Sequence, residues 1–67
     1  MRYWLYMQSD TYPAELFGPY AGLDEAGNAL KRLAMAAYKR RDQVSRVYAI
    51  VKGRDREAAW QEAMNLF

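Results

Sequence analysis

Residues 23–41 read LDEAGNALKRLAMAAYKRR, and their apolar spacing is that of an amphipathic helix. One stripe follows the 3.6-residue period; it comprises Ala26, Leu30, Leu33, Ala34 and Ala37, with Tyr38 at its edge. Gly22 can cap the helix start, where Asp24 and Glu25 complement the positive end of the helix dipole. The cations Lys39, Arg40 and Arg41 complement the negative end. The opposite face carries Asn28, Arg32, Met35 and Lys39.

Strands are predicted on both sides of this helix. Arg2–Gln8 alternates, with Tyr3, Leu5 and Met7 on one face and Trp4, Tyr6 and Gln8 on the other. Aromatic residues on both faces favour a central strand, or one whose second face is covered by a partner. Ala14–Phe17 is a second strand, ended by Gly18 and Pro19, which pairs with the first as a hairpin. Val44–Lys52 is a third, in which Val47, Ala49 and Val51 alternate with Arg46, Tyr48 and Ile50.

Asp55 can cap a second helix that runs from about Arg56 to the C-terminus. Its apolar stripe consists of Trp60, Ala63, Met64 and Phe67. We therefore expect a single domain over residues 1–67 with a small two-layer α+β fold in the order β-β-α-β-α. Its three-stranded, mainly antiparallel sheet would carry both helices on one face. Leu30, Leu33 and Trp60 are expected in the core.

The composition argues against several classes of function. The 67 residues contain no cysteine and no histidine, so disulfides, thiolate metal sites and the familiar acid–base and thiol nucleophiles are absent. The carboxylates are scattered, and Gly18, Gly22 and Gly27 form no phosphate-binding pattern; they are interpreted as a turn, a cap and a close helix contact. We expect no enzyme, cofactor or metal, and a cytoplasmic protein with neither a signal peptide nor a membrane span.

Charge is strongly segregated along the chain. Residues 30–56 hold nine of the ten basic side chains and two of the eight acidic ones, a net charge of +7, whereas the remainder has a net charge of −5. Separated charge of this kind can steer an encounter with an anionic partner. Two interpretations stay open: ordinary solvated cations, or one phosphate-binding patch. That patch would join Lys39, Arg40, Arg41, Arg46, Lys52, Arg54 and Arg56.

The aromatic residues suggest a second candidate surface. If the faces of Leu5 and Ala49 both point toward the helices, the opposite sheet face is open. It would then present Trp4, Tyr6, Arg46, Tyr48 and Ile50. Aromatic and arginine side chains can stack on single-stranded bases, anchor a protein partner or join two copies of the chain. If these aromatics are instead core residues, the binding surface lies around Arg32, Met35 and Lys39.

Two resemblances bear on function. The stretch LFGPYAGLDEA, residues 16–26, resembles the strand–GP-aromatic–helix phrase of SPOR-type peptidoglycan-binding domains. That family's repeated β-α-β half has no counterpart here, so its glycan binding is not carried over. In size, absence of His and Cys, and segregated charge, the chain also resembles the small proteins with which bacteriophages disable host machinery, including anti-CRISPR proteins. This resemblance implies binding by occlusion in a bacterial host cytoplasm.

We therefore expect a non-enzymatic binding protein that docks on a larger protein or protein–nucleic-acid machine and blocks it sterically. A phage or mobile-element inhibitor of a host system such as CRISPR-Cas is the most concrete version. The alternatives are a small nucleic-acid-binding protein and a homodimeric scaffold. The expected partner-binding residues are Trp4, Tyr6, Arg32, Met35, Lys39, Arg40, Arg41, Arg46, Tyr48, Lys52 and Arg54.

Overall fold

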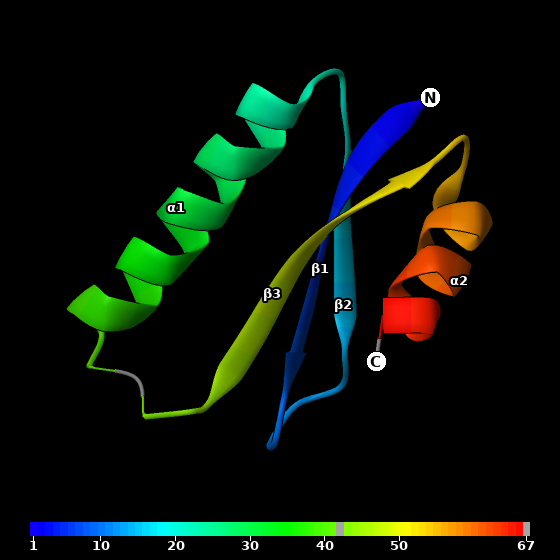
Figure 1. Ribbon diagram of the computed structural model, residues 1–67. Helices are drawn as coiled ribbons and strands as arrows, with labels where there is room; N and C mark the ends of the chain where they lie inside the picture. The colour runs from blue at the N-terminus through cyan, green and yellow to red at the C-terminus, as the bar shows by residue number, and fades with distance from the viewer. Residues whose placement is uncertain (42, 67) are drawn as a thin grey trace.

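The computed structural model describes residues 1–41 and 43–66, and its elements follow the predicted order (Figure 1). They are β1 (Arg2–Ser9), β2 (Glu15–Tyr20), α1 (Leu23–Lys39), β3 (Arg46–Gly53) and α2 (Arg56–Leu66). The strands lie in the order β2-β1-β3, and both pairings are antiparallel. The small α+β class is thus confirmed, with β1 at the centre of the sheet.

The boundaries of four elements differ from the predicted ones, and the smallest difference is in β1, which ends at Ser9 rather than at Gln8. β2 continues through Gly18 and Pro19 to Tyr20, which pairs with Tyr3 after a shift of register. Gly18 lies at this irregularity with a φ of 131°, which only glycine takes easily. α1 ends at Lys39, and the left-handed φ of 53° at Arg41 turns the chain away from the helix axis. β3 begins at Arg46 rather than at Val44.

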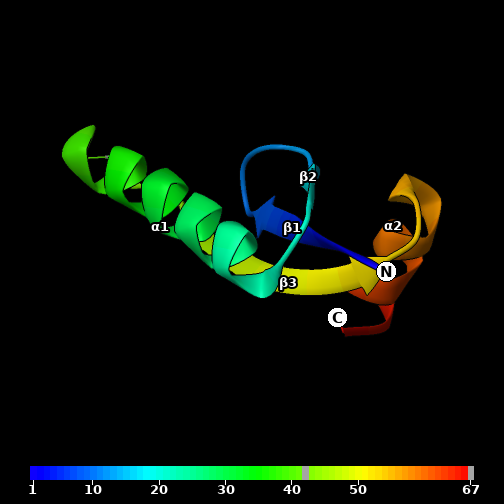
Figure 2. The same ribbon diagram turned by 90° about the horizontal axis from the view of Figure 1, so that it is seen from above.

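The two helices lie on opposite faces of the sheet, so the expectation of a two-layer fold with both helices on one face is wrong. Figures 1 and 2 show the sheet between α1 and α2, and the described residues of the two helices do not pack on each other. The reason lies in β1, which carries Trp4 and Tyr6 on one face and Leu5 on the other. Since each set has to be removed from water, each face takes one helix.

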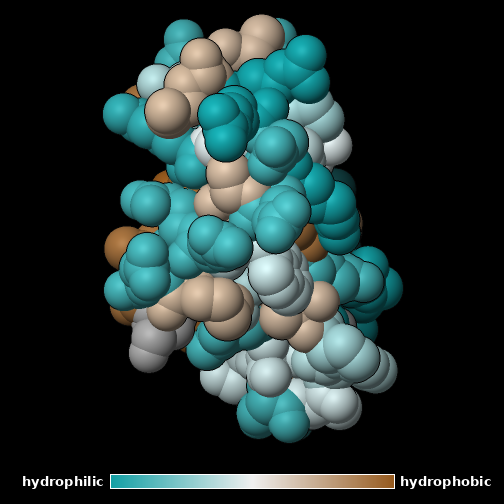
Figure 3. Space-filling view, turned by 90° about the vertical axis from the view of Figure 1, so that its right-hand side faces the viewer, coloured by the Kyte–Doolittle hydropathy of each residue, from teal (hydrophilic) through white to brown (hydrophobic). Residues whose placement is uncertain are grey.

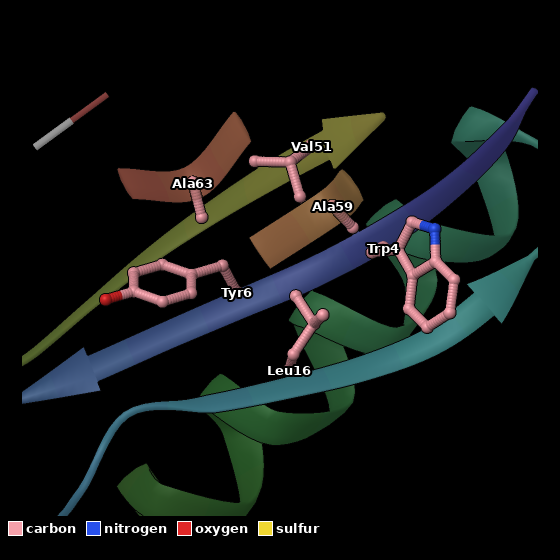
Figure 4. Close-up of a cluster of buried hydrophobic side chains, with 6 residues drawn as sticks. All are labelled: Trp4, Tyr6, Leu16, Val51, Ala59 and Ala63. Carbon is pink, nitrogen blue, oxygen red and sulfur yellow. The ribbon is translucent and has the colours of Figure 1, made fainter. Parts of the chain in front are cut away.

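The face under α2 holds a compact apolar cluster (Figure 4). It comprises Trp4, Tyr6, Leu16, Val51, Ala59 and Ala63, with Ala14, Ala49 and Trp60 packed against it. The register pairs Trp4 with Val51, and Tyr6 with Ala49, so the assignment of Ala49 to the face of Leu5 is wrong. The predicted α2 stripe is only partly correct, because Met64 is exposed; Phe67 lies outside the described residues.

Gly53 lets α2 pack closely on the end of β3. A Cβ atom at this position would lie 2.5 Å from the backbone nitrogen of Ala59. The Gly53 carbonyl oxygen also accepts a hydrogen bond of 2.9 Å from the indole Nε1 of Trp4. As predicted, Asp55 caps α2: its Oδ1 accepts a 2.8 Å hydrogen bond from the backbone N–H of Ala58.

The face under α1 is covered less evenly. Leu5 is fully buried there, and the buried residues of α1 are Ala26 and Ala29, both in its first half. Leu30, Leu33 and Trp60 were expected in the core; all three are half-buried, and Trp60 packs against the cluster under α2. Small side chains make the closest approach, because alanine lets a helix backbone come nearer to the sheet than leucine does.

Candidate functional site

The proposed aromatic sheet face is not open. Trp4 and Tyr6 are only 5% and 2% exposed, and both lie beneath α2 (Figure 4). Tyr6 stacks edge-on against Trp60 at a centroid distance of 5.5 Å and donates a 2.9 Å hydrogen bond to the Oε1 of Gln8. Their assignment to a partner-binding surface is therefore wrong, since both serve the core.

Tyr48 and Arg46 lie on the other face of the sheet. Together with residues of β1, β2 and α1 they line a groove of about 300 Å³ beside the second half of α1. Its lining comprises Met7, Glu15, Phe17, Leu33, Ala36, Ala37, Arg40, Arg46 and Tyr48. Tyr48 and Arg46 are half-buried in this groove. Because the groove is on the opposite face of the sheet from Trp4 and Tyr6, the four residues do not form one surface.

The solvent-facing side of α1 is the surface that remains. Its members are exposed and three or four residues apart, so they adjoin along the helix; they are Lys31, Arg32, Met35, Tyr38 and Lys39, here named the α1 surface. Met35 is 54% exposed and Tyr38 is 79% exposed, in the midst of these cations. No acidic residue occurs between residues 26 and 41. The α1 surface therefore has Met35 and Tyr38 at its centre and cationic side chains around them.

Sequence analysis missed two members, Lys31 and Tyr38. Tyr38 counted as the edge of the buried stripe, but the helix turns it toward solvent. The spacing of Lys31, Met35 and Tyr38, four residues and then three, was the available signal, because it places them on one side of the helix. Arg32, Met35 and Lys39 were expected there if the sheet aromatics were core residues, and this placement is correct.

The basic residues form two groups rather than one patch. Lys39, Arg40 and Arg41 surround the C-terminal end of α1, and Arg40 shares the groove with Arg46; we name these four the basic end. Lys52 and Arg54 lie at the opposite end of β3. Lys52 lies six positions along the strand from Arg46, a distance of about 20 Å. The single phosphate-binding patch, one of the two interpretations left open by the sequence, is therefore divided.

Lys52, near the end of β3, and Arg56, at the start of α2, each contact another part of the fold. The Nζ of Lys52 lies 5.9 Å from the ring centroid of Tyr3, and Arg56 donates a 2.9 Å hydrogen bond from its Nη1 to the carbonyl oxygen of Leu16. Arg54 is exposed in the turn before α2. Figure 3 views the side of the molecule that α2 covers, and this side is mostly hydrophilic.

Comparisons with known proteins find no match among protein-family models, curated proteins or solved structures. Within residues 1–41 and 43–66, no three acidic side chains gather as a metal site would require. None of the described helices is long and apolar enough to cross a membrane.

Proposed function

We propose that the protein is a non-enzymatic binding protein that docks through the α1 surface on a larger protein or nucleoprotein machine and blocks it sterically. The most concrete version is a phage or mobile-element inhibitor of a host defence such as CRISPR-Cas, acting in the bacterial cytoplasm. The proposal extends the resemblance in size and charge segregation to small phage inhibitors.

The exposure of Met35 and Tyr38 among cations is the observation that carries this proposal. Soluble proteins rarely keep large apolar side chains together in water without a use, and methionine, tyrosine and arginine are enriched at protein interfaces. Cations around such a centre add steering toward an acidic surface. A standard interface needs about 800 Å² from each partner. The chain exposes 4962 Å² in all, so an interface of this size would cover about a sixth of its surface.

A plaque assay tests the proposal in cells. Bacterial strains that each carry one defined CRISPR-Cas system and a guide against the same phage would express the wild-type protein. In a susceptible strain, plaque formation is expected to rise to the level of a strain without the guide. The double variant Met35→Ala/Tyr38→Ala is expected to lose this effect, because two interface anchors of more than 1 kcal/mol each correspond to about thirtyfold weaker binding.

The matched control is Tyr12→Ala, which removes an exposed tyrosine from the turn between β1 and β2 instead of from α1. It is expected to restore plaques as the wild type does. The α1 proposal would be refuted by a double variant that blocks defence as well as the wild type. The inhibitor proposal would be refuted if the wild type restored no plaques in any of the strains.

The basic end favours a second candidate function, binding to nucleic acid phosphates. Lys39 and Arg41 are exposed beside the groove that Arg40 and Arg46 line. Cations gathered in this way would bind DNA or RNA with an affinity that falls steeply as salt rises. Anisotropy titrations with labelled single- and double-stranded 30-mers at low and physiological salt test this function. Lys39→Glu/Arg41→Glu should abolish the binding, and no binding at low salt would exclude it.

A further inference from the structure

β3 is an edge strand whose outer side is available for pairing. It pairs with β1 along all eight of its residues, and among residues 1–41 and 43–66 no strand pairs with its other side. In an antiparallel pair, alternate residues direct their N–H and C=O groups away from the neighbour. Within the part of the chain that the structure describes, Val47–Lys52 make no backbone hydrogen bond except those to β1. Half of these residues therefore present unpaired groups along the edge.

The other edge of the sheet is a much poorer template. β2 contains Gly18 with its φ of 131°, and Pro19, which has no N–H to donate. The pairing of β2 with β1 also shifts register between Tyr3 and Leu5. Irregularities of this kind are how proteins protect an edge strand from pairing. Residues 46–52 contain neither glycine nor proline, so β3 is the regular edge.

The charge along β3 indicates what kind of strand would pair with it. Residues 43–54 contain Arg46, Lys52 and Arg54 and no acidic residue. Arg46 and Lys52 point to the same face of the sheet, near the two ends of the strand. An incoming strand would therefore meet a cation at each end and, between them on the same face, Tyr48 and Ile50.

A second copy of this chain fits that pattern poorly. In antiparallel pairing, residues on the same face must lie opposite each other, which restricts the register. If β3 pairs with β3 of a second copy, two registers align the most residues. One of them places Arg46 opposite Lys52 of the other copy, and the other places Arg46 opposite Arg54. Like charges directly opposite each other destabilise a sheet. An acidic strand would instead form favourable pairs at both ends.

We propose that the outer edge of β3 is a docking site for an extended acidic segment of a partner protein, which adds to the sheet as a fourth strand. The segment would carry acidic residues six positions apart and apolar residues at the two same-face positions between them. This inference rests on the proposed role as a binding protein and adds the chemistry of the partner. Backbone pairing would provide affinity, and the charged ends would fix the register.

A synthetic peptide tests the proposal on the isolated protein. Its central sequence is Glu-Thr-Val-Thr-Val-Thr-Glu, flanked by Gly-Ser, and the matched control has lysine in place of both glutamates. Two-dimensional NMR at peptide concentrations up to millimolar is expected to show shifts of the Val47–Lys52 amides with the glutamate peptide alone. Lys52→Glu should weaken the binding by about fivefold, the effect of a cross-strand charge pair near 1 kcal/mol. Gln61→Glu/Asn65→Glu, which changes the net charge equally on the exposed side of α2, should not weaken it.

N-methylation of the peptide adds a test specific to strand pairing. Methylation of one alternating set of amides should abolish binding, whereas methylation of the other set should not, because only one set faces β3. Equal binding of the lysine peptide, equal effects of both methylated sets, or an unshifted edge at millimolar peptide would each overturn the proposal. Shifts of the same amides with protein concentration alone would assign the edge to a second copy instead. The peptide assay does not involve α1. A negative result with the peptide would therefore refute the β3 proposal without changing the interpretation of the plaque assay.

Discussion

The packing of α2 on Gly53 allows one stability prediction to be worked from distances. In Gly53→Ala, the new methyl carbon would lie 2.5 Å from the backbone nitrogen of Ala59, 2.8 Å from its Cα and 2.9 Å from its Cβ. None of these atoms ends a flexible side chain, so α2 has to move away from β3. The move also strains the hydrogen bond from Trp4 to the Gly53 carbonyl.

The expected cost is about 2–3 kcal/mol, the range for overpacking a close-packed interior. A 67-residue domain has a total stability of about 3–10 kcal/mol, so this loss is a large share of it. Urea unfolding followed by far-ultraviolet circular dichroism measures the loss as a lower midpoint. Alanine also restricts the unfolded chain, which raises the free energy of unfolding by less than about 1 kcal/mol. The cost of the steric conflict is larger than this gain.

Gly27→Ala is the matched control, because a Cβ atom at Gly27 meets nothing within 4 Å outside its own helix. It is expected to stabilise the protein by about 1 kcal/mol, the difference in helix propensity. If Gly53→Ala proves too unstable to measure, both midpoints can be compared in the Gly27→Ala background. A Gly53→Ala midpoint at or above that of the wild type would refute the close packing of α2 on β3.

Three further predictions use the same urea assay. Leu5→Ala should cost about 3 kcal/mol and the half-buried Leu33→Ala only about 1 kcal/mol, and the reverse order would mean that α1 is rotated about its axis. Asp55→Ala should cost about 1 kcal/mol through loss of the α2 cap, whereas an unchanged midpoint would show that the hydrogen bond to Ala58 contributes nothing. Met35→Ala/Tyr38→Ala should change stability by less than about 0.5 kcal/mol, and a large loss would place these side chains in the core.

The element order followed from the sequence because its signals are local. The apolar period, the acids at Asp24 and Glu25 and the cap at Asp55 each act within a few residues. The sequence did not predict which face of the sheet each helix covers. An amphipathic stripe indicates that one side of a helix is buried, but not against which face of the sheet. The aromatic residues on both faces of β1 did indicate two covered faces, and the second cover is α2 rather than a partner.

The candidate site was predictable only in part. Arg32, Met35 and Lys39 follow from the helical period of α1 alone, so they were placed correctly. Whether Trp4 and Tyr6 are buried depends on the register of β1 against β3. That register is set by contacts between residues far apart in the sequence. Gly27 was interpreted as a close contact and has open space, while Gly53 makes the close contact; the difference arises from where α2 packs.

The most direct test of the α1 surface is hydroxyl-radical oxidation of the protein, alone and saturated with the purified complex of whichever CRISPR-Cas system the plaque assay identifies as its target. Methionine and tyrosine side chains report their own exposure, and the chain provides internal controls in Met64 on α2 and Tyr12 in the first turn, both exposed. We predict that the complex protects Met35 and Tyr38 and leaves Met64 and Tyr12 as reactive as in the free protein. Protection of Met64 with no change at Met35 and Tyr38 would contradict the account.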